Sequence, residues 1–217
     1  TDKKIGIEGE DAEGVTSAVE MLRAIGDQEP IDYTGQDVIV VGGGNVSMDV
    51  ARSAVRLGAK SVKVVYRRRI IDMTALDEEI YGAIADGCEI LELNSPVRIE
   101  KDANGKVEAL VVQPQLIGEI NKGRASVKTA DTPEVAIKCD QIIVQGIDSS
   151  KLEESGVHIS RGHIEALDTS DVEGVDGLFA GGDCVTGPAT VIKAIAAGKV
   201  AAANIDEYLG YNHVIDA

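Results

Sequence analysis

The 217-residue sequence is poor in aromatic residues, with no Trp, one Phe and five Tyr. Because its hydrophobic content is nevertheless 44%, the core must be aliphatic, built chiefly from Val, Ile and Ala. A chain of this length buries one or two small cores, so we expect one or two domains. Basic residues are also few, and the net charge is −16. This charge argues against nucleic acid or an anionic membrane as the main partner.

Cysteine is scarce as well. Cys88, Cys139 and Cys184 lie far apart, and no C-x-x-C is present. This spacing excludes a redox dithiol, a zinc ribbon and an iron–sulfur ligand run within these residues. An odd cysteine count favours a reducing compartment, and we expect a cytoplasmic protein. The three histidines do not have metal-ligand spacing either, so we predict no metal site.

Long apolar runs are missing. The longest, "TVIKAIAAGKVAAANI", is interrupted by Lys193 and Lys199 and is too short to cross a bilayer. The opening residues "TDKKIGIEGEDAEG" contain no apolar run of the kind a secretory signal has, and they begin without Met. We therefore expect that the chain neither crosses a membrane nor carries an export signal, and that it is a segment excised from a longer protein.

The first half of the chain shows a β-α-β pattern. "EGVTSAVEMLRAIGD" predicts a helix over 13–27, and the continuous apolar run "VIVV" predicts a strand buried on both faces of a parallel sheet. A helix over 45–57 and a second strand, "SVKVVY", follow. "MTALDEEIYGAIADG" predicts another helix, in which Thr74 and Asp77 form a capping box, before the strand "CEILEL".

The pattern then changes. "VRIEKDANGKVEALVVQP" places two strands around an Asn-Gly turn, and "VAIKCDQIIVQGID" follows a polar loop with an extended segment and a buried strand ending at Gly146. We predict a three-stranded antiparallel insertion over 97–137. The remainder predicts a hairpin, a short strand "GLFAGGD" and a helix of small residues. The fold class is therefore α/β: a Rossmann-like domain with an antiparallel β insertion.

The turn "GGGNVS" at 42–47 fits G-x-G-x-x-S, a variant of the dinucleotide fingerprint. Gly42 permits the tight turn, Gly44 lets a pyrophosphate approach the backbone, and Ser47 lets the helix pack close to the sheet. The helix N-terminus offers free N–H groups to the phosphates. The candidate dinucleotide-binding residues are Gly42, Gly43, Gly44, Asn45, Val46 and Ser47. The alternative is a structural glycine turn with no ligand.

Three arginines end the second strand, in "YRRR" at 66–69. NAD-type sites usually place Asp or Glu there, on the ribose hydroxyls. A planar guanidinium instead suits a ribose 2′-phosphate, so Arg67 and Arg68 predict NADP(H). Arg69 is a less certain ligand, since one pair of guanidinium groups already covers a phosphate. The alternative is a solvated basic loop in an acidic protein.

"VIVVGGGNVSMDVAR", "GAKSVKVVYRRR" and "GLFAGGDCVTGPATVIKAIAAGKVAAANI" together resemble the small (β) subunit of NADPH-dependent glutamate synthase. More broadly, they resemble the flavoprotein half shared with dihydropyrimidine dehydrogenase and NADPH–ferredoxin oxidoreductases. The likeness covers essentially the whole chain. Glu8 and Thr74 stand where this family usually has proline.

The resemblance implies a glutathione-reductase-like architecture of two dinucleotide domains. Residues 1–33 would be a remnant of the FAD domain with a linker, 34–146 the NADPH-binding domain, and 147–217 the C-terminal part of the FAD domain. Asp183 would accept from a ribityl hydroxyl, and the helix opened by "GPATV" would point at the flavin pyrimidine edge. The resemblance thus adds Gly182, Asp183, Pro188, Ala189 and Thr190 to the candidate cofactor-binding residues. Gly146, at the end of the predicted buried strand, is a further candidate. From the residues alone, "GGD" is equally a glycine-rich turn and the helix equally plain close packing.

The family's iron–sulfur segments and first FAD-binding glycine turn are not among these residues, so we expect the chain alone to hold little FAD and to oxidise NADPH negligibly. In the family, electrons pass from NADPH through FAD to iron–sulfur centres, with a large catalytic subunit or ferredoxin as partner. Alternatives are the same module serving ferredoxin or pyrimidine reduction, and a non-catalytic NADP-binding regulatory module. A thioredoxin-reductase-like activity would need a close cysteine pair, which these residues lack.

Overall fold

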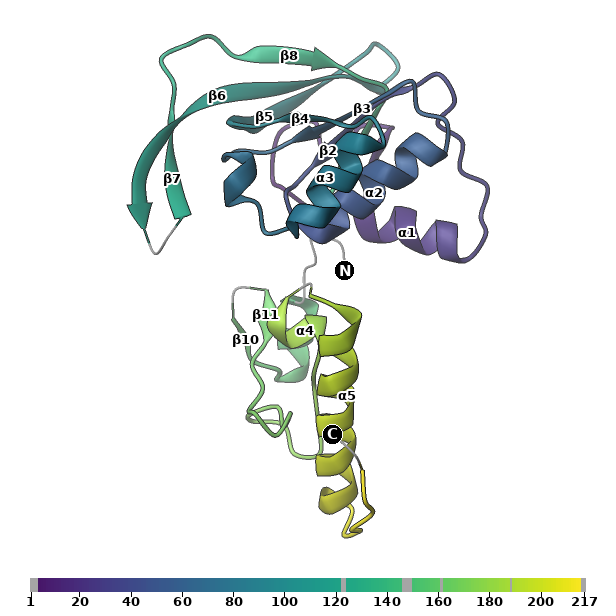
Figure 1. Ribbon diagram of the computed structural model, residues 1–217, viewed down its shortest axis with the longest axis vertical. Coiled ribbons are helices and arrows are strands. Elements are labelled where there is room, and N and C mark those ends of the chain that lie inside the picture. Colours follow the sequence, from purple (N-terminus) through teal and green to yellow (C-terminus); the bar gives the residue numbers. More distant parts are fainter. Residues whose placement is uncertain (1–3, 122–123, 146–149, 161, 188, 216–217) are drawn as a thin grey trace. The chain divides into compact units, whose positions relative to one another are not determined.

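The structure is a computed structural model that describes residues 4–121, 124–145, 150–160, 162–187 and 189–215. The chain divides into two units, Asp2–Gly146 and Ile147–Ala217. The first unit carries a parallel sheet, three helices and an antiparallel sheet. The second carries a small hairpin and a long helix (Figure 1).

A five-stranded parallel sheet forms the centre of the first unit, in the order β1-β9-β2-β3-β4. Its strands are β1 (Val15–Ser17), β2 (Asp37–Val41), β3 (Ser61–Val65), β4 (Glu89–Leu91) and β9 (Gln141–Val144). Every neighbouring pair in it is parallel. The run 38–41 is buried throughout, which confirms the prediction of a strand covered on both faces.

Helices α1 (Ala18–Gly26), α2 (Asn45–Arg56) and α3 (Asp77–Ala85) cover one face of this sheet (Figure 1). Val38 and Val40 of β2 belong to the core on that side, together with Met48 of α2. Ile39 and Val41 belong to the core on the opposite side. Alternation along one strand therefore supplies apolar side chains to two separate cores, because successive residues point to opposite faces.

An antiparallel sheet covers the second face. It consists of β5 (Asn94–Lys101), β6 (Val107–Asn121), β7 (Arg124–Thr129) and β8 (Val135–Lys138), with β6 pairing the other three. Leu110 and Val112 of β6 pack in the same core as Ile39. The β5–β6 turn contains Gly105 at φ +85°, and the Asn-Gly hairpin is confirmed.

The insertion differs from the prediction in one strand. We expected three strands and a polar loop, but β6 is 15 residues long and its distal half pairs with β7 (Figure 1). A register shift between Ile117 and Ile120 breaks the alternation there. At Gly118 a Cβ would lie 2.5 Å from Ser126 Oγ, so a side chain at this close approach would force Ser126 to move.

Two local predictions near helix starts are wrong. The first helix begins at Ala18, because Val15–Ser17 pair with β9 and the Ser17 side chain accepts from Glu20 N at 2.9 Å, which caps α1. The capping box does not form either. α3 begins at Asp77, and Thr74 Oγ1 donates to Gly43 O at 3.3 Å instead.

The second unit contains a 3₁₀ turn η2 (Ser150–Ser155), the hairpin β10 (Ile159–Ser160) and β11 (His163–Ile164), a short helix α4 (Asp183–Thr186) and the long helix α5 (Val191–Tyr208). The hairpin and the small-residue helix are confirmed. The strand expected in "GLFAGGD" is wrong, since that segment makes only an isolated bridge from Phe179 to Asp171. A bridge of one residue gives no ladder.

None of the helices in the described part of the chain has the length and apolar character that crossing a bilayer requires. Within the described residues, His, Cys, Asp and Glu side chains nowhere gather in threes in a way that suits a metal ion.

Candidate dinucleotide-binding site

Gly42 begins the turn between β2 and α2. Its N–H donates to Val65 O at 3.2 Å, which ties the turn to the neighbouring strand β3. Its φ is +148°, and a Cβ there would lie 2.3 Å from Ser47 Oγ. A side chain at this position would therefore meet both an unfavourable backbone conformation and a buried neighbour.

Gly43 fastens the turn to the segment that follows the arginines. A Cβ at Gly43 would lie 2.5 Å from the Tyr66 ring, so the ring packs directly on the glycine. The Gly43 carbonyl accepts from Thr74 N at 2.9 Å and from Ala75 N at 3.0 Å. The glycine turn and the segment 66–75 are thus joined by direct packing and by hydrogen bonds.

Gly44 is different, because the fold places little demand on it. A Cβ there would lie 3.2 Å from the amide end of Gln145, a flexible side chain. Gly44 is also the N-cap of α2, and no side chain caps that helix, whereas Ser17 caps α1. The bare backbone and the uncapped helix start leave N–H groups for an anion.

Ser47 and Gln145 lie behind the turn. Ser47 is fully buried, and its hydroxyl donates to Gln145 Oε1 at 2.9 Å. Sequence reasoning missed Gln145. Its position directly after β9 was the available signal, since the carboxyl ends of neighbouring parallel strands meet at one edge of a sheet.

Asn45 and Val46 bring only their main chains to the turn. The Asn45 side chain accepts from Leu76 N at 2.8 Å, so it holds the start of α3. The Val46 side chain packs against the helical core.

The three arginines are not equivalent. Arg67 is exposed, and within the described part of the chain no hydrogen bond or ion pair holds its guanidinium. Arg68 is partly buried, and its Nε donates to Ala125 O at 3.1 Å. Arg69 pairs with Asp72 through Nε at 2.7 Å and a second nitrogen at 3.1 Å. Arg69 is therefore occupied by a structural partner, while Arg67 and the terminal nitrogens of Arg68 remain for a ligand.

An open pocket of about 460 Å³ lies at the carboxyl ends of β2, β3 and β9. Gly42, Tyr66, Arg67 and Gln145 line it, together with Lys4. It therefore joins the glycine turn to the first arginine. In open α/β sheets, ligands bind at this edge of the strands.

The residues proposed for the flavin side lie in the second unit. Gly182 has φ +74° and is the N-cap of α4, and the exposed carboxylate of Asp183 accepts from Ala189 N at 3.3 Å. Thr190 caps α5 by accepting from Lys193 N at 3.4 Å. Asp183 and Ala189 are thus brought together. Gly146 and Pro188 lie outside the described residues.

A glycine turn at the central strand of a parallel sheet, with an antiparallel sheet on the opposite face, defines an α/β domain of the dinucleotide-binding class. The chain belongs to the pyridine nucleotide-disulphide oxidoreductase family, whose model matches residues 1–198. The chain is 34% identical over 212 residues to the NADP(+)-dependent formate dehydrogenase subunit beta of Moorella thermoacetica, covering 95% of this chain and 30% of that protein. It is also 34% identical over 223 residues to the glutamate synthase [NADPH] small chain of Escherichia coli, covering 94% and 47%.

The chain therefore spans less than half the length of either relative, and the expected similarity to glutamate synthase small subunits is confirmed. Among solved structures, FprA from Mycobacterium tuberculosis (His57Gln mutant) matches with a TM-score of 0.73 and 18% identity, over 97% of this chain and 62% of that one. Thioredoxin reductase from T. acidophilum matches with a TM-score of 0.71 and 18% identity, over the same 97% and 62%. These two matches confirm the fold class.

Proposed function

We propose that this chain is the NADPH-binding portion of a flavin-dependent oxidoreductase. The observation that carries the proposal is the pairing of an uncapped helix start at Gly44 with the arginine segment, which is fastened to the same turn through Gly43. One site then offers main-chain donors for a pyrophosphate and guanidinium groups for a further phosphate.

Each part of the site has a distinct role in this proposal. The main-chain N–H groups at 44–46 bind the pyrophosphate, and Ser47 with Gln145 holds the turn in shape. Arg67 and Arg68 bind the ribose 2′-phosphate. In a chain of net charge −16, such a local cluster of cations is what makes an anion bind here rather than elsewhere.

The second unit supplies residues that fit a flavin. The Asp183 carboxylate is exposed and has an oxygen beyond its bond to Ala189 N, so it suits a hydroxyl donor. The proposed FAD contacts are Gly182, Asp183, Pro188, Ala189 and Thr190, and Gly146 is proposed for the cofactor-binding set from the sequence. When bound, FAD would supply a group able to accept a hydride from NADPH and to release single electrons toward iron–sulfur centres elsewhere in the protein.

For the whole protein, we propose a glutamate synthase small-subunit type, located in the cytoplasm, with a large catalytic subunit or ferredoxin as partner. One relative is named as a formate dehydrogenase subunit, which keeps other acceptors open. The similarity to multi-subunit enzymes over the whole chain supports a role as part of a larger assembly. It weighs against a purely regulatory NADP-binding module.

The test is a calorimetric titration of the 217-residue chain with NADPH and with NADH. We expect NADPH to bind at least ten times more tightly. Gly44→Ala is the matched control: its Cβ requires only a small shift of the Gln145 amide, and it removes the close approach to the pyrophosphate, so both cofactors should bind weakly. Equal affinity of the unaltered chain for the two cofactors would refute the NADPH assignment, and unchanged binding by the Gly44 variant would refute the site.

A further inference from the structure

Asp72 is a buried carboxylate beside the arginines. Only 5% of the residue is exposed. Burying a charged group is unfavourable unless it is paired and hydrogen-bonded. Arg69 supplies two hydrogen bonds to it, and the Ala125 main chain donates a third at 3.5 Å. The pKa of Asp72 lies below its usual value, chiefly because Arg69 hydrogen-bonds the ionised carboxylate. The Ala125 N–H lowers this pKa further.

Ala125 connects this carboxylate to Arg68. It lies in β7, far along the chain, and is 2% exposed. Its N–H donates to Asp72 and its carbonyl accepts from Arg68 Nε at 3.1 Å. Both main-chain groups of Ala125 therefore serve the arginine segment. The β6–β7 hairpin is the support on which Arg68 rests.

Asp72 is also joined to the glycine turn, through Tyr66. The Tyr66 hydroxyl donates to the Asp72 carbonyl oxygen at 2.9 Å, and the Tyr66 ring packs on Gly43. Asp72 thus lies at the junction of three parts: the turn, the arginine segment and the hairpin.

We infer that Asp72 is a positioning residue for recognition of the 2′-phosphate, acting through Arg68 without contacting the ligand. With Arg69 and the Ala125 main chain, it holds Arg68 in one arrangement before the cofactor arrives. A side chain that is already ordered loses less conformational entropy on binding, so the affinity for the phosphate rises. The inference rests on the proposed NADPH site and assigns to Arg69 a supporting role rather than a ligand role.

The experiment compares Asp72→Asn with the unaltered chain, using four probes: NADPH, NADH, 2′,5′-ADP and 5′-ADP. Asparagine keeps the shape and removes the charge. We expect Kd to rise at least tenfold for NADPH and 2′,5′-ADP and to change less than twofold for NADH and 5′-ADP. If Asp72 only stabilised the fold, its substitution would weaken the binding of all four probes alike. Arg69→Lys, which keeps the positive charge but loses the two-point bond, is the second variant and should show a smaller loss of the same kind.

A double-variant cycle tests whether the effect passes through Arg68. In an Arg68→Ala background, Asp72→Asn should cause little further loss of NADPH affinity, since the positioned group is gone. A full additional loss would overturn the inference. Unchanged NADPH binding by Asp72→Asn would also overturn it. Tighter NADPH binding would do so too, because it would mean that Arg69 becomes a phosphate ligand once released. Failure of the NADPH proposal itself is separate, since it shows as no preference in the unaltered chain.

Discussion

The carbonyl oxygen of Ala125 accepts a hydrogen bond from Arg68 Nε, across 57 positions of the chain. This contact joins the tip region of an antiparallel hairpin to the end of a parallel strand. The insertion therefore does more than cover one face of the sheet. It also sets the arrangement of the arginine proposed to bind phosphate.

Replacing Arg67 or Arg68 by alanine should weaken the binding of NADPH and leave the affinity for NADH nearly unchanged. A hydrogen bond to a charged group contributes about 1.5–3 kcal/mol, so each change should raise Kd for NADPH roughly ten- to a hundred-fold. Salt should weaken NADPH binding in the unaltered chain more than in either variant. Calorimetric titrations at two ionic strengths measure both effects. A parallel loss of NADH affinity would show that the arginines act on another part of the cofactor.

The three glycines of the turn should respond differently to alanine. At Gly42, positive φ and the approach to Ser47 make the change destabilising, and backbone strain alone costs about 1–3 kcal/mol. At Gly43, the Tyr66 ring must move. At Gly44, we expect an unfolding temperature close to that of the unaltered chain but loss of dinucleotide binding. Thermal unfolding and cofactor titration of the three variants separate the effects; a large drop in unfolding temperature for Gly44→Ala would contradict this assignment.

Stability should depend on pH through Asp72. Its pKa is lower in the folded chain than in the unfolded chain, because Arg69 hydrogen-bonds the ionised form. Its contribution is therefore complete above the unfolded pKa of about 3.9 and is lost as pH falls through the folded value. The difference in unfolding free energy between the unaltered chain and Asp72→Asn should be constant from about pH 8 to 5 and shrink below about pH 4. Denaturant unfolding across this range measures it. If the difference in unfolding free energy grew on acidification instead, the ionised form of Asp72 would not be the stabilising one, and this would contradict its pairing with Arg69.

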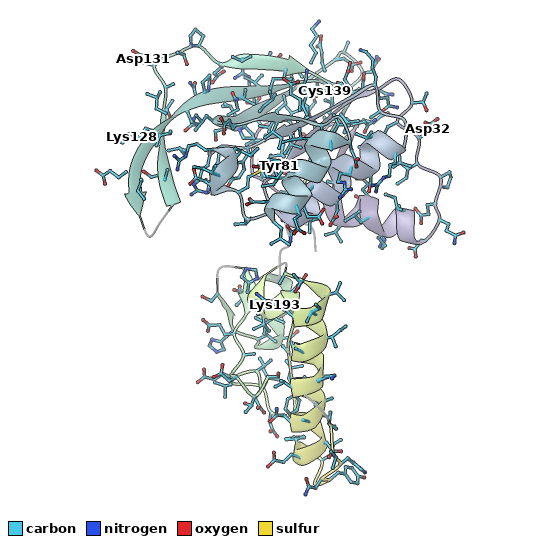
Figure 2. The ribbon with its side chains drawn as sticks, in the orientation of Figure 1. Asp32, Tyr81, Lys128, Asp131, Cys139 and Lys193 are labelled. Atoms are coloured by element: carbon cyan, nitrogen blue, oxygen red, sulfur yellow. The ribbon has the colours of Figure 1, made fainter. Side chains whose placement is uncertain are left out.

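One thiol should react readily and two should not. Burial raises the pKa of Cys88 to about 11 and that of Cys139 to about 12. Cys139 lies among the strands of the first unit (Figure 2), whereas Cys184 is exposed. A thiol reagent at about pH 8 should therefore modify one cysteine quickly in the folded chain, and all three after denaturation. Cys184→Ser is the control, and it should abolish the fast phase. Fast modification of two or three thiols would mean that one of the cores opens readily.

Much of the fold could be predicted because its cause is local. The apolar run 38–41, the glycine turn and the Asn-Gly hairpin each carry their own pattern. β1 could not be predicted in this way, since three residues become a strand only by pairing with β9, far along the chain. The distal half of β6 was missed for another reason: the register shift between Ile117 and Ile120 interrupts the alternation along that strand, so no partner strand for β7 could be recognised in the sequence.

In the candidate site, too, some residues could be predicted from local patterns and others could not. The glycines and arginines follow from motif chemistry, but the inequality of the arginines does not. Arg69 differs from Arg67 because its guanidinium is paired with Asp72. Arg68 differs from Arg67 because its Nε donates to the carbonyl of Ala125, in a distant hairpin. Gln145 likewise reaches the turn only because β9 lies beside β2. These contacts depend on tertiary pairing, which a single sequence does not display.

The position of β9 has a consequence for the order in which the chain folds. β9 lies between β1 and β2, so the N-terminal strand pairs with the sheet only through a strand made much later. During synthesis, β2 and β3 can pair early, but β1 stays without a partner strand until residues 141–144 have emerged. By then the whole antiparallel insertion has already been made, and it can cover Ile39 and Val41 first. The sheet of the first unit is therefore complete only when β9 is in place between β1 and β2, and the same docking brings Gln145 to Ser47 behind the glycine turn.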